Sequence, residues 1–153
     1  MRLYKIYYAT LMTKEGDILK RTINVVGAII ENDKHEILCA KRSSEMMLPG
    51  LWEFPGGKIE MDESLKEAVE REILEELGCK VEFIRVFHDN THEYNDYIVK
   101  LITVICKIAS SNSPKAIEHE KLAWVKRNSL LDLKWAPADI PAVKLLQAEA
   151  SVK

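Results

Sequence analysis

The chain has 153 residues, of which 47% are hydrophobic, a composition that suits a single domain over residues 1–153 with its own core. Its net charge is −2, and this excludes the broad positive surplus on which binding to long nucleic acid depends. An acidic protein still binds a polyphosphate when a divalent metal ion bridges the two.

The three cysteines are far apart in the sequence, form no CxxC pair and have apolar neighbours. We therefore expect reduced, buried thiols. The N-terminus lacks the apolar segment of a signal peptide, and no run of about 18 apolar residues occurs that could cross a membrane. These features predict a soluble, cytoplasmic protein with no membrane partner. The cysteines are Cys39, Cys79 and Cys106.

Strands are predicted in the first part of the chain. Residues 3–11 are rich in β-formers, residues 14–17 supply a turn, and residues 18–22 return as a second strand. Residues 1–22 therefore read as an extra N-terminal hairpin, which could extend a sheet edge or form a dimer contact. Apolar runs over 23–30 and 36–41 predict the next pair of strands.

A loop that is rich in proline and glycine leads to a predicted central helix. Asp62 is its expected N-cap and Gly78 its C-terminal stop, with apolar residues at helical spacing between them. Strands that flank this helix, with a second helix at the end, predict an α+β fold, an α/β/α sandwich on a mixed sheet. The later elements are strands over 80–87, 97–108 and 122–125 and a helix over 140–150.

Three carboxylates share one face of the predicted helix. Glu75 and Glu76 lie three and four residues after Glu72, which places neighbouring Cβ atoms about 5–6 Å apart. Like charges at this spacing repel one another, and a hard divalent cation such as Mg²⁺ removes that penalty. Arg71 can hold one of the carboxylates in place. Taken alone, such a face is more often only solvated.

The pattern of residues from Gly57 to Cys79 decides between a metal-binding face and a solvated one. It resembles the Nudix box at every fixed position, although Cys79 replaces the usual aliphatic residue at the end. A match over so many constrained positions is highly specific. The fixed positions are Gly57, Glu63, Arg71, Glu72, Glu75, Glu76 and Gly78.

The Nudix family hydrolyses a nucleoside diphosphate linked to another group, and it uses divalent metal. The resemblance implies Mg²⁺, with Mn²⁺ as a possible substitute, and a role for Arg71 in orienting Glu72 or a neighbour. It implies a structural or outer role for Glu63. The implied metal ligands are Glu72, Glu75, Glu76 and the main-chain carbonyl of Gly56.

The catalytic base has two candidates. Glu72 is the first. The second is Glu118, which lies six residues before Trp124, as does the carboxylate that serves MutT-type members as metal ligand or base. Read from the residues alone, Glu118 and Glu120 are as readily ordinary surface acids, and His119 is structural rather than catalytic.

The similarity to MutT-type members, including the branch that acts on cytidine nucleotides, spans residues 24–146 and is close over 50–60 and 135–141. It implies that Phe54 lines a base pocket and that Asp139 reads the base. An ionised aspartate only accepts hydrogen bonds, so it prefers a cytosine amino group or the N–H groups of a guanine edge. The alternatives are a core aromatic for Phe54 and a helix N-cap for Asp139.

Further substrate contacts come from the same resemblance. Arg42 and Lys58 are candidates for phosphate or sugar binding, although a solvated position is the usual outcome for isolated cations. Tyr94 and Tyr97 are candidates for the open side of the pocket.

The leading hypothesis is a Mg²⁺-dependent enzyme of nucleotide house-cleaning. It would hydrolyse (deoxy)nucleoside triphosphates, modified or pyrimidine ones such as 8-oxo-dGTP or CTP included, to monophosphate and pyrophosphate. Alternatives are a Nudix hydrolase of nucleotide sugars, dinucleoside polyphosphates or RNA 5′ ends, and a non-catalytic nucleotide-binding regulator. The sequence leaves both a monomer and a homodimer open.

Overall fold

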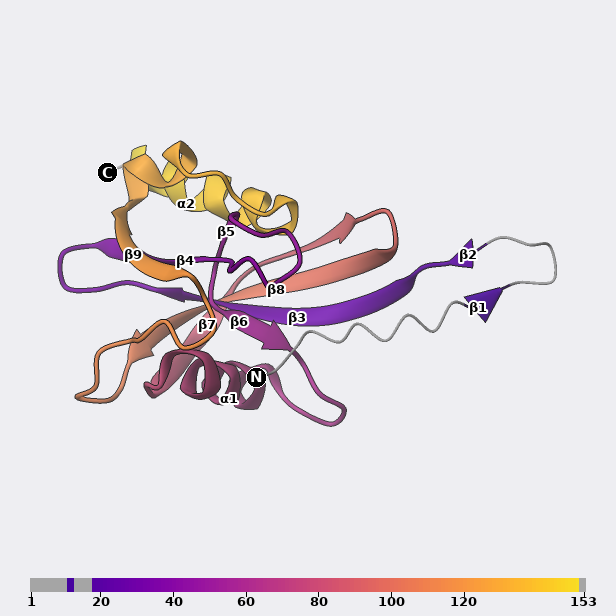
Figure 1. The fold of residues 1–153 in the computed structure, drawn as a ribbon. Coiled ribbons are helices and arrows are strands. Elements are labelled where there is room, and N and C mark those ends of the chain that lie inside the picture. The colour runs from indigo at the N-terminus through magenta and orange to yellow at the C-terminus, as the bar shows by residue number, and fades with distance from the viewer. Residues whose placement is uncertain (1–10, 13–17, 152–153) are drawn as a thin grey trace.

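Two sheets and two helices form the main part of the computed structural model, which describes residues 11–12 and 18–151 (Figure 1). A four-stranded sheet has the order β6-β3-β8-β7, and a three-stranded sheet has the order β5-β4-β9. Strands β3 and β8 run parallel while their other neighbours are antiparallel, so the predicted mixed sheet is confirmed.

The strands are β1 (Leu11–Met12), β2 (Ile18–Leu19), β3 (Arg21–Ile30), β4 (Glu36–Lys41), β5 (Trp52–Glu53), β6 (Gly56–Lys58), β7 (Val81–Glu93), β8 (Tyr97–Ile108) and β9 (Lys121–Lys126). The helices are α1 (Leu65–Leu77), the short 3-10 helices η1 (Arg127–Asp132) and η2 (Pro137–Asp139), and α2 (Ile140–Ser151).

The alternating side chains of the strands build a core on each side of the sheets. Ala28 and Ile30 of β3 pack with Ile73 of α1, whereas Ile29 between them packs with Val143 of α2. Successive side chains of a strand point to opposite faces, so one strand serves both cores. Helices α1 and α2 therefore cover opposite sides of the sheets (Figure 1), as the predicted α/β/α sandwich requires.

Helix α1 begins later than the sequence analysis predicts. Its N-cap is Ser64, whose Oγ accepts from Glu67 N at 3.1 Å while the Glu67 carboxylate accepts from Ser64 N at 3.3 Å. Asp62 has a φ of 62° in the preceding turn, so its expected N-cap role is wrong. Gly78 closes the helix with a φ of 65° and donates its N–H to Leu74 O, as predicted.

The strand predictions differ in their success. Strands over 36–41 and 97–108 are confirmed with their bounds, but β7 continues to Glu93. Two register shifts interrupt the alternation of apolar and polar side chains along β7, and the length of a strand is predicted from that alternation. Strands β5 and β6, of two and three residues, lie in the segment predicted as loop. They are too short to show periodicity.

At the N-terminal end, β1 and β2 pair antiparallel, with Leu11 opposite Leu19. The rest of the predicted hairpin, residues 3–10 and 13–17, lies outside the described residues, and residues 21–22 belong to β3. The three cysteines are free and buried, as expected. No helix in the described part of the chain is long and apolar enough to span a membrane.

Candidate active site

Strand β6 brings two glycines against the carboxylates of α1. A Cβ on Gly56 would lie 1.9 Å from the Val26 carbonyl oxygen, and a Cβ on Gly57 would lie 2.5 Å from Glu72 Cδ. Gly56 N also donates to Glu76 Oε2 at 3.2 Å. Only glycine permits this close approach, so the structure brings Gly56, Glu72 and Glu76 together.

Glu72 and Glu76 are buried, with exposed fractions of 7% and 3%. Burial, and then the nearby charges of Glu53 and Glu72, raise the pKa of Glu76 well above its usual range, and Glu118 adds to this effect. Glu118 is near because Ile117 N donates to Glu76 O at 3.3 Å, which ties its loop to the end of α1. The predicted acidic residues thus form a centre of like charge.

Arg71 neutralises the outer part of this centre. Its guanidinium donates to both oxygens of Glu63 at 2.6 and 2.7 Å, to Glu72 at 2.6 Å and to Glu75 at 3.4 Å. The hydrogen bonds to Glu63 and then Glu72 raise the pKa of Arg71, so it is permanently charged. Among the described residues, no three Asp, Glu, Cys or His side chains lie close enough together to hold a metal ion while Arg71 keeps these bonds.

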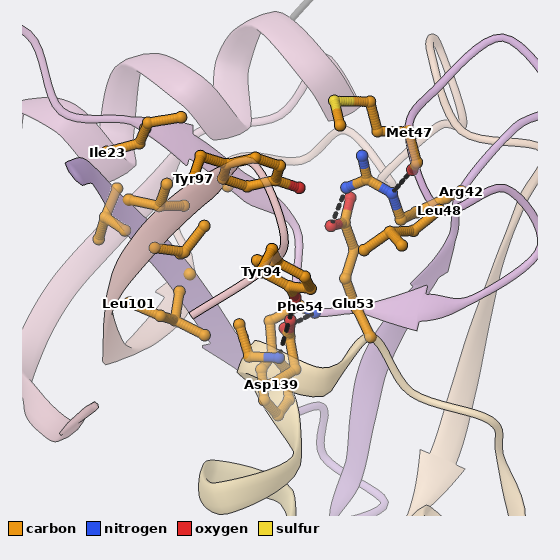
Figure 2. A pocket seen from close by; sticks show the side chains of 17 residues that line it. Ile23, Arg42, Met47, Leu48, Glu53, Phe54, Tyr94, Tyr97, Leu101 and Asp139 are labelled. Atoms are coloured by element: carbon orange, nitrogen blue, oxygen red, sulfur yellow. Dashed lines mark hydrogen bonds and ion pairs between the residues drawn. The ribbon is translucent and has the colours of Figure 1, made fainter. Parts of the chain in front are cut away.

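A pocket of roughly 700 Å³, open solvent at its mouth included, lies among β3, β5, β8 and η2 (Figure 2). Phe54, Asp139 and Arg42 line it, as the resemblance implies, and so do Tyr94 and Tyr97. Gly56 is part of the same lining. The pocket and the acidic centre therefore meet at the Gly56 backbone.

Asp139 ties the start of α2 to the loop that carries Phe54. Its Oδ1 accepts from Phe54 N at 3.0 Å, so the carboxylate serves the pocket rather than the helix N-terminus. Burial, and then the charge of Glu53, raise the pKa of Asp139 well above its usual range. Phe54 is only 3% exposed and packs on Trp135 with ring centroids 4.9 Å apart, so it is a core aromatic as well as a pocket residue.

Two stacked tyrosines also line the pocket. The rings of Tyr94 and Tyr97 are 5.0 Å apart at the turn between β7 and β8. The Tyr94 hydroxyl accepts from Ala138 N at 3.1 Å, which joins this pair to the segment of Asp139. Burial raises the pKa of Tyr94 to about 12.

Two further residues, Glu53 and Lys58, complete the description of the site. Glu53 was missed as a site residue, yet its carboxylate binds Arg42 at 2.5 Å and His119 at 2.8 Å. Its position between two aromatic residues on a short buried strand is a signal that could have indicated it. Lys58 is exposed and absent from the pocket lining, and its carbonyl accepts from Arg71.

Residues 21–146 match the family model of the NUDIX domain, which is most of the chain. The chain belongs to the NUDIX family. This Nudix hydrolase is 37% identical over 128 residues to the CTP pyrophosphohydrolase of Escherichia coli (strain K12), a match that covers 84% of this chain and 93% of the relative. It is 35% identical over 125 residues to the putative 8-oxo-dGTP diphosphatase 2 of Mycobacterium tuberculosis (strain ATCC 25618 / H37Rv), a match that covers 76% of this chain and 82% of the relative.

The fold also resembles solved Nudix structures. The solution NMR structure of DNA mismatch repair protein MutT (family Nudix hydrolase) from methicillin-resistant Staphylococcus aureus 252 matches with a TM-score of 0.69 and 46% identity. That match covers 86% of this chain and 99% of the other. Nudix hydrolases generally use a divalent metal ion, so the acidic centre is the part of this fold to test for one.

Proposed function

We propose that this Nudix hydrolase converts nucleoside triphosphates to monophosphate and pyrophosphate with Mg²⁺, and that Mn²⁺ substitutes for it. The observation that carries the proposal is the position of Gly56, which lines the pocket and binds Glu76 of the acidic centre. A base in the pocket would therefore place its phosphate chain beside the carboxylates. The names of the two relatives, a CTP pyrophosphohydrolase and a putative 8-oxo-dGTP diphosphatase, support this substrate class.

The chemistry of the acidic centre fits a hard divalent cation. Carboxylate and carbonyl oxygens are the ligands that Mg²⁺ takes, and the cation would relieve the repulsion among buried glutamates. Glu72 and Glu75 would then exchange their hydrogen bonds with Arg71 for the metal. When bound, the ion would supply an acidified water and would neutralise charge on the phosphates. The residues that would hold it are Glu72, Glu75, Glu76, Glu118 and the carbonyl of Gly56.

The remaining residues have roles in proton transfer and orientation. Glu72 is our first candidate to accept the proton of the attacking water, and Glu118 is the second. Before the metal binds, Arg71, which is anchored on Glu63, keeps the Glu72 carboxylate in place. Arg42 at the pocket rim and the exposed Lys58 would contact the sugar or phosphates.

Asp139 selects the base in this proposal. One of its oxygens accepts from Phe54 N, and the carboxyl group lines the pocket. An ionised group accepts from the cytosine amino group, and a protonated group also donates. We therefore propose cytidine or oxidised guanine nucleotides as the preferred substrates, held between Phe54 and the Tyr94–Tyr97 pair.

Steady-state kinetics on a panel of canonical and oxidised (deoxy)nucleoside triphosphates tests the proposal, with product identification by chromatography. We expect Mg²⁺-dependent release of monophosphate and pyrophosphate. Asp139→Asn should change the ratio of kcat/KM between bases by about tenfold, the worth of one buried charged hydrogen bond.

Each of these expectations has a result that would contradict it. Absence of turnover on the whole panel would refute the triphosphate proposal, and turnover of nucleotide sugars or dinucleoside polyphosphates alone would move the activity to another Nudix class. An unchanged base ratio in Asp139→Asn would leave Asp139 as a structural link to Phe54. Lys144→Gln on α2, outside the pocket lining, is the matched control for the effect of an unrelated substitution.

A further inference from the structure

His119 is a buried histidine whose side chain bonds Glu53. Its side chain is 0% exposed, and Nε2 lies 2.8 Å from Glu53 Oε1. Among the described residues, its Nδ1 has no hydrogen-bond partner. A buried nitrogen without a partner costs about 1–3 kcal/mol, so an apolar residue would fill this space more favourably unless the bond to Glu53 is needed.

The segment that carries His119 is fixed at both ends by the backbone. On one side Ile117 N donates to Glu76 O of α1 at 3.3 Å, and on the other Glu120 N donates to Lys41 O at 2.9 Å. Glu118 and His119 lie between these two points. The side-chain bond from His119 to Glu53 is a further attachment of the loop, and it adjoins Glu118 directly.

Glu53 connects this loop to the nucleotide pocket. Its second oxygen binds Arg42 at 2.5 Å, and Arg42 also donates to the Met47 carbonyl at the pocket rim (Figure 2). Burial alone would raise the pKa of Glu53, but the hydrogen bond from His119 and the charge of Arg42 outweigh it and lower the pKa. Because an ionised carboxylate only accepts, we assign the bridging proton to His119 Nε2. A hydrogen bond to a charged acceptor is stronger than one between two neutral groups.

We propose that His119 is a positioning residue whose hydrogen bond to Glu53 holds Glu118 beside the α1 carboxylates. Through Arg42 the same carboxylate links the Glu118 loop to the nucleotide pocket. The inference rests on the proposed function of Glu118 as a ligand or base. His119 itself touches neither substrate nor metal in this account.

The test compares two amides at position 119. In His119→Gln the side-chain nitrogen reaches about as far as Nε2, whereas in His119→Asn it is shorter and cannot reach Glu53. Mn²⁺ affinity is measured without nucleotide by electron paramagnetic resonance, and kcat with Mg²⁺ and CTP in parallel. We expect His119→Asn to lose about tenfold or more in both, and His119→Gln to retain most of each, since outer partners of metal ligands typically contribute about 10–100-fold.

Glu120→Gln is the matched control in the same loop, because its side chain is exposed and pairs with Lys41 at 3.5 Å at the surface. Thermal unfolding of each variant identifies any loss of fold. Equal Mn²⁺ affinity in the Asn and Gln variants, whether normal or reduced, would overturn the positioning role. A wild-type protein that binds no Mn²⁺ would overturn the metal site and this proposal with it. Mn²⁺ binding without turnover of any nucleotide would refute only the proposed reaction.

Discussion

At the scale of single residues, the two adjacent glycines of β6 are required for different reasons. A Cβ on Gly56 would meet backbone, the Val26 carbonyl at 1.9 Å, and backbone cannot move without breaking the pairing of β3 with β6. A Cβ on Gly57 would meet the carboxylate of Glu72, the far end of a flexible side chain. Gly56 is therefore required for the pairing of the strands, and Gly57 is required for the position of the Glu72 side chain.

We predict that alanine separates these two roles. Gly56→Ala should lower the free energy of unfolding by more than about 2 kcal/mol, because the sheet must shift. Gly57→Ala should fold with a loss below about 1.5 kcal/mol but displace Glu72, so that kcat falls by about tenfold or more. Urea unfolding and steady-state kinetics measure the two effects. Similar stability losses in both variants, with similar activity, would contradict the distinction.

At the scale of elements, α1 shows how a local signal decides a boundary. Asp62 and Ser64 are both residue types that cap helices, and the N-cap predicted from the sequence is Asp62. The structure selects Ser64 because Glu67, three residues later, completes a capping box. That pattern was visible in the sequence, so this boundary could have been predicted.

Removal of this cap gives the second prediction. Ser64→Ala should cost about 1 kcal/mol in free energy of unfolding, because Glu67 N loses its acceptor. Asp62→Gly should stay within about 0.5 kcal/mol, since residue 62 has a left-handed φ that glycine adopts freely. Urea unfolding of both variants measures this. If Asp62→Gly is the more costly change, Asp62 has a stabilising role that the cap does not explain.

The rest of the site could be predicted only in part. Helical spacing placed Glu72, Glu75 and Glu76 on one face, which needs no knowledge of tertiary structure. The pocket is different, because it joins β3, β5, the β7–β8 turn and η2, which are far apart in the sequence. The partners of Glu53 became visible only when the fold placed its carboxylate between Arg42 and His119.

At the scale of the whole molecule, like charges concentrate where the sheets, α1 and η2 meet. Burial and then the charge of Glu53 raise the pKa of both Glu76 and Asp139. A carboxyl group with a raised pKa binds more protons in the folded than in the unfolded state. Its contribution to stability therefore falls as pH rises from its unfolded value, about 4, to the raised value. Ionisation of these two carboxyl groups therefore opposes folding of the metal-free protein.

The last prediction concerns how the stability of the protein depends on pH without metal and on the addition of Mg²⁺. In EDTA, the free energy of unfolding of Glu76→Gln should exceed that of the wild type by a margin that grows as pH rises above about 4, the unfolded pKa of a glutamate, and stops growing once the raised pKa is passed. Mg²⁺ at a hundred times its dissociation constant should then stabilise the wild type by about 2.7 kcal/mol, but not the variant. Urea unfolding across this pH range, with and without Mg²⁺, measures both effects, and Glu82→Gln on β7 controls for the removal of a negative charge elsewhere. A margin that is constant with pH would show that Glu76 is not strained by burial, and equal stabilisation of the two proteins by Mg²⁺ would place the metal away from Glu76.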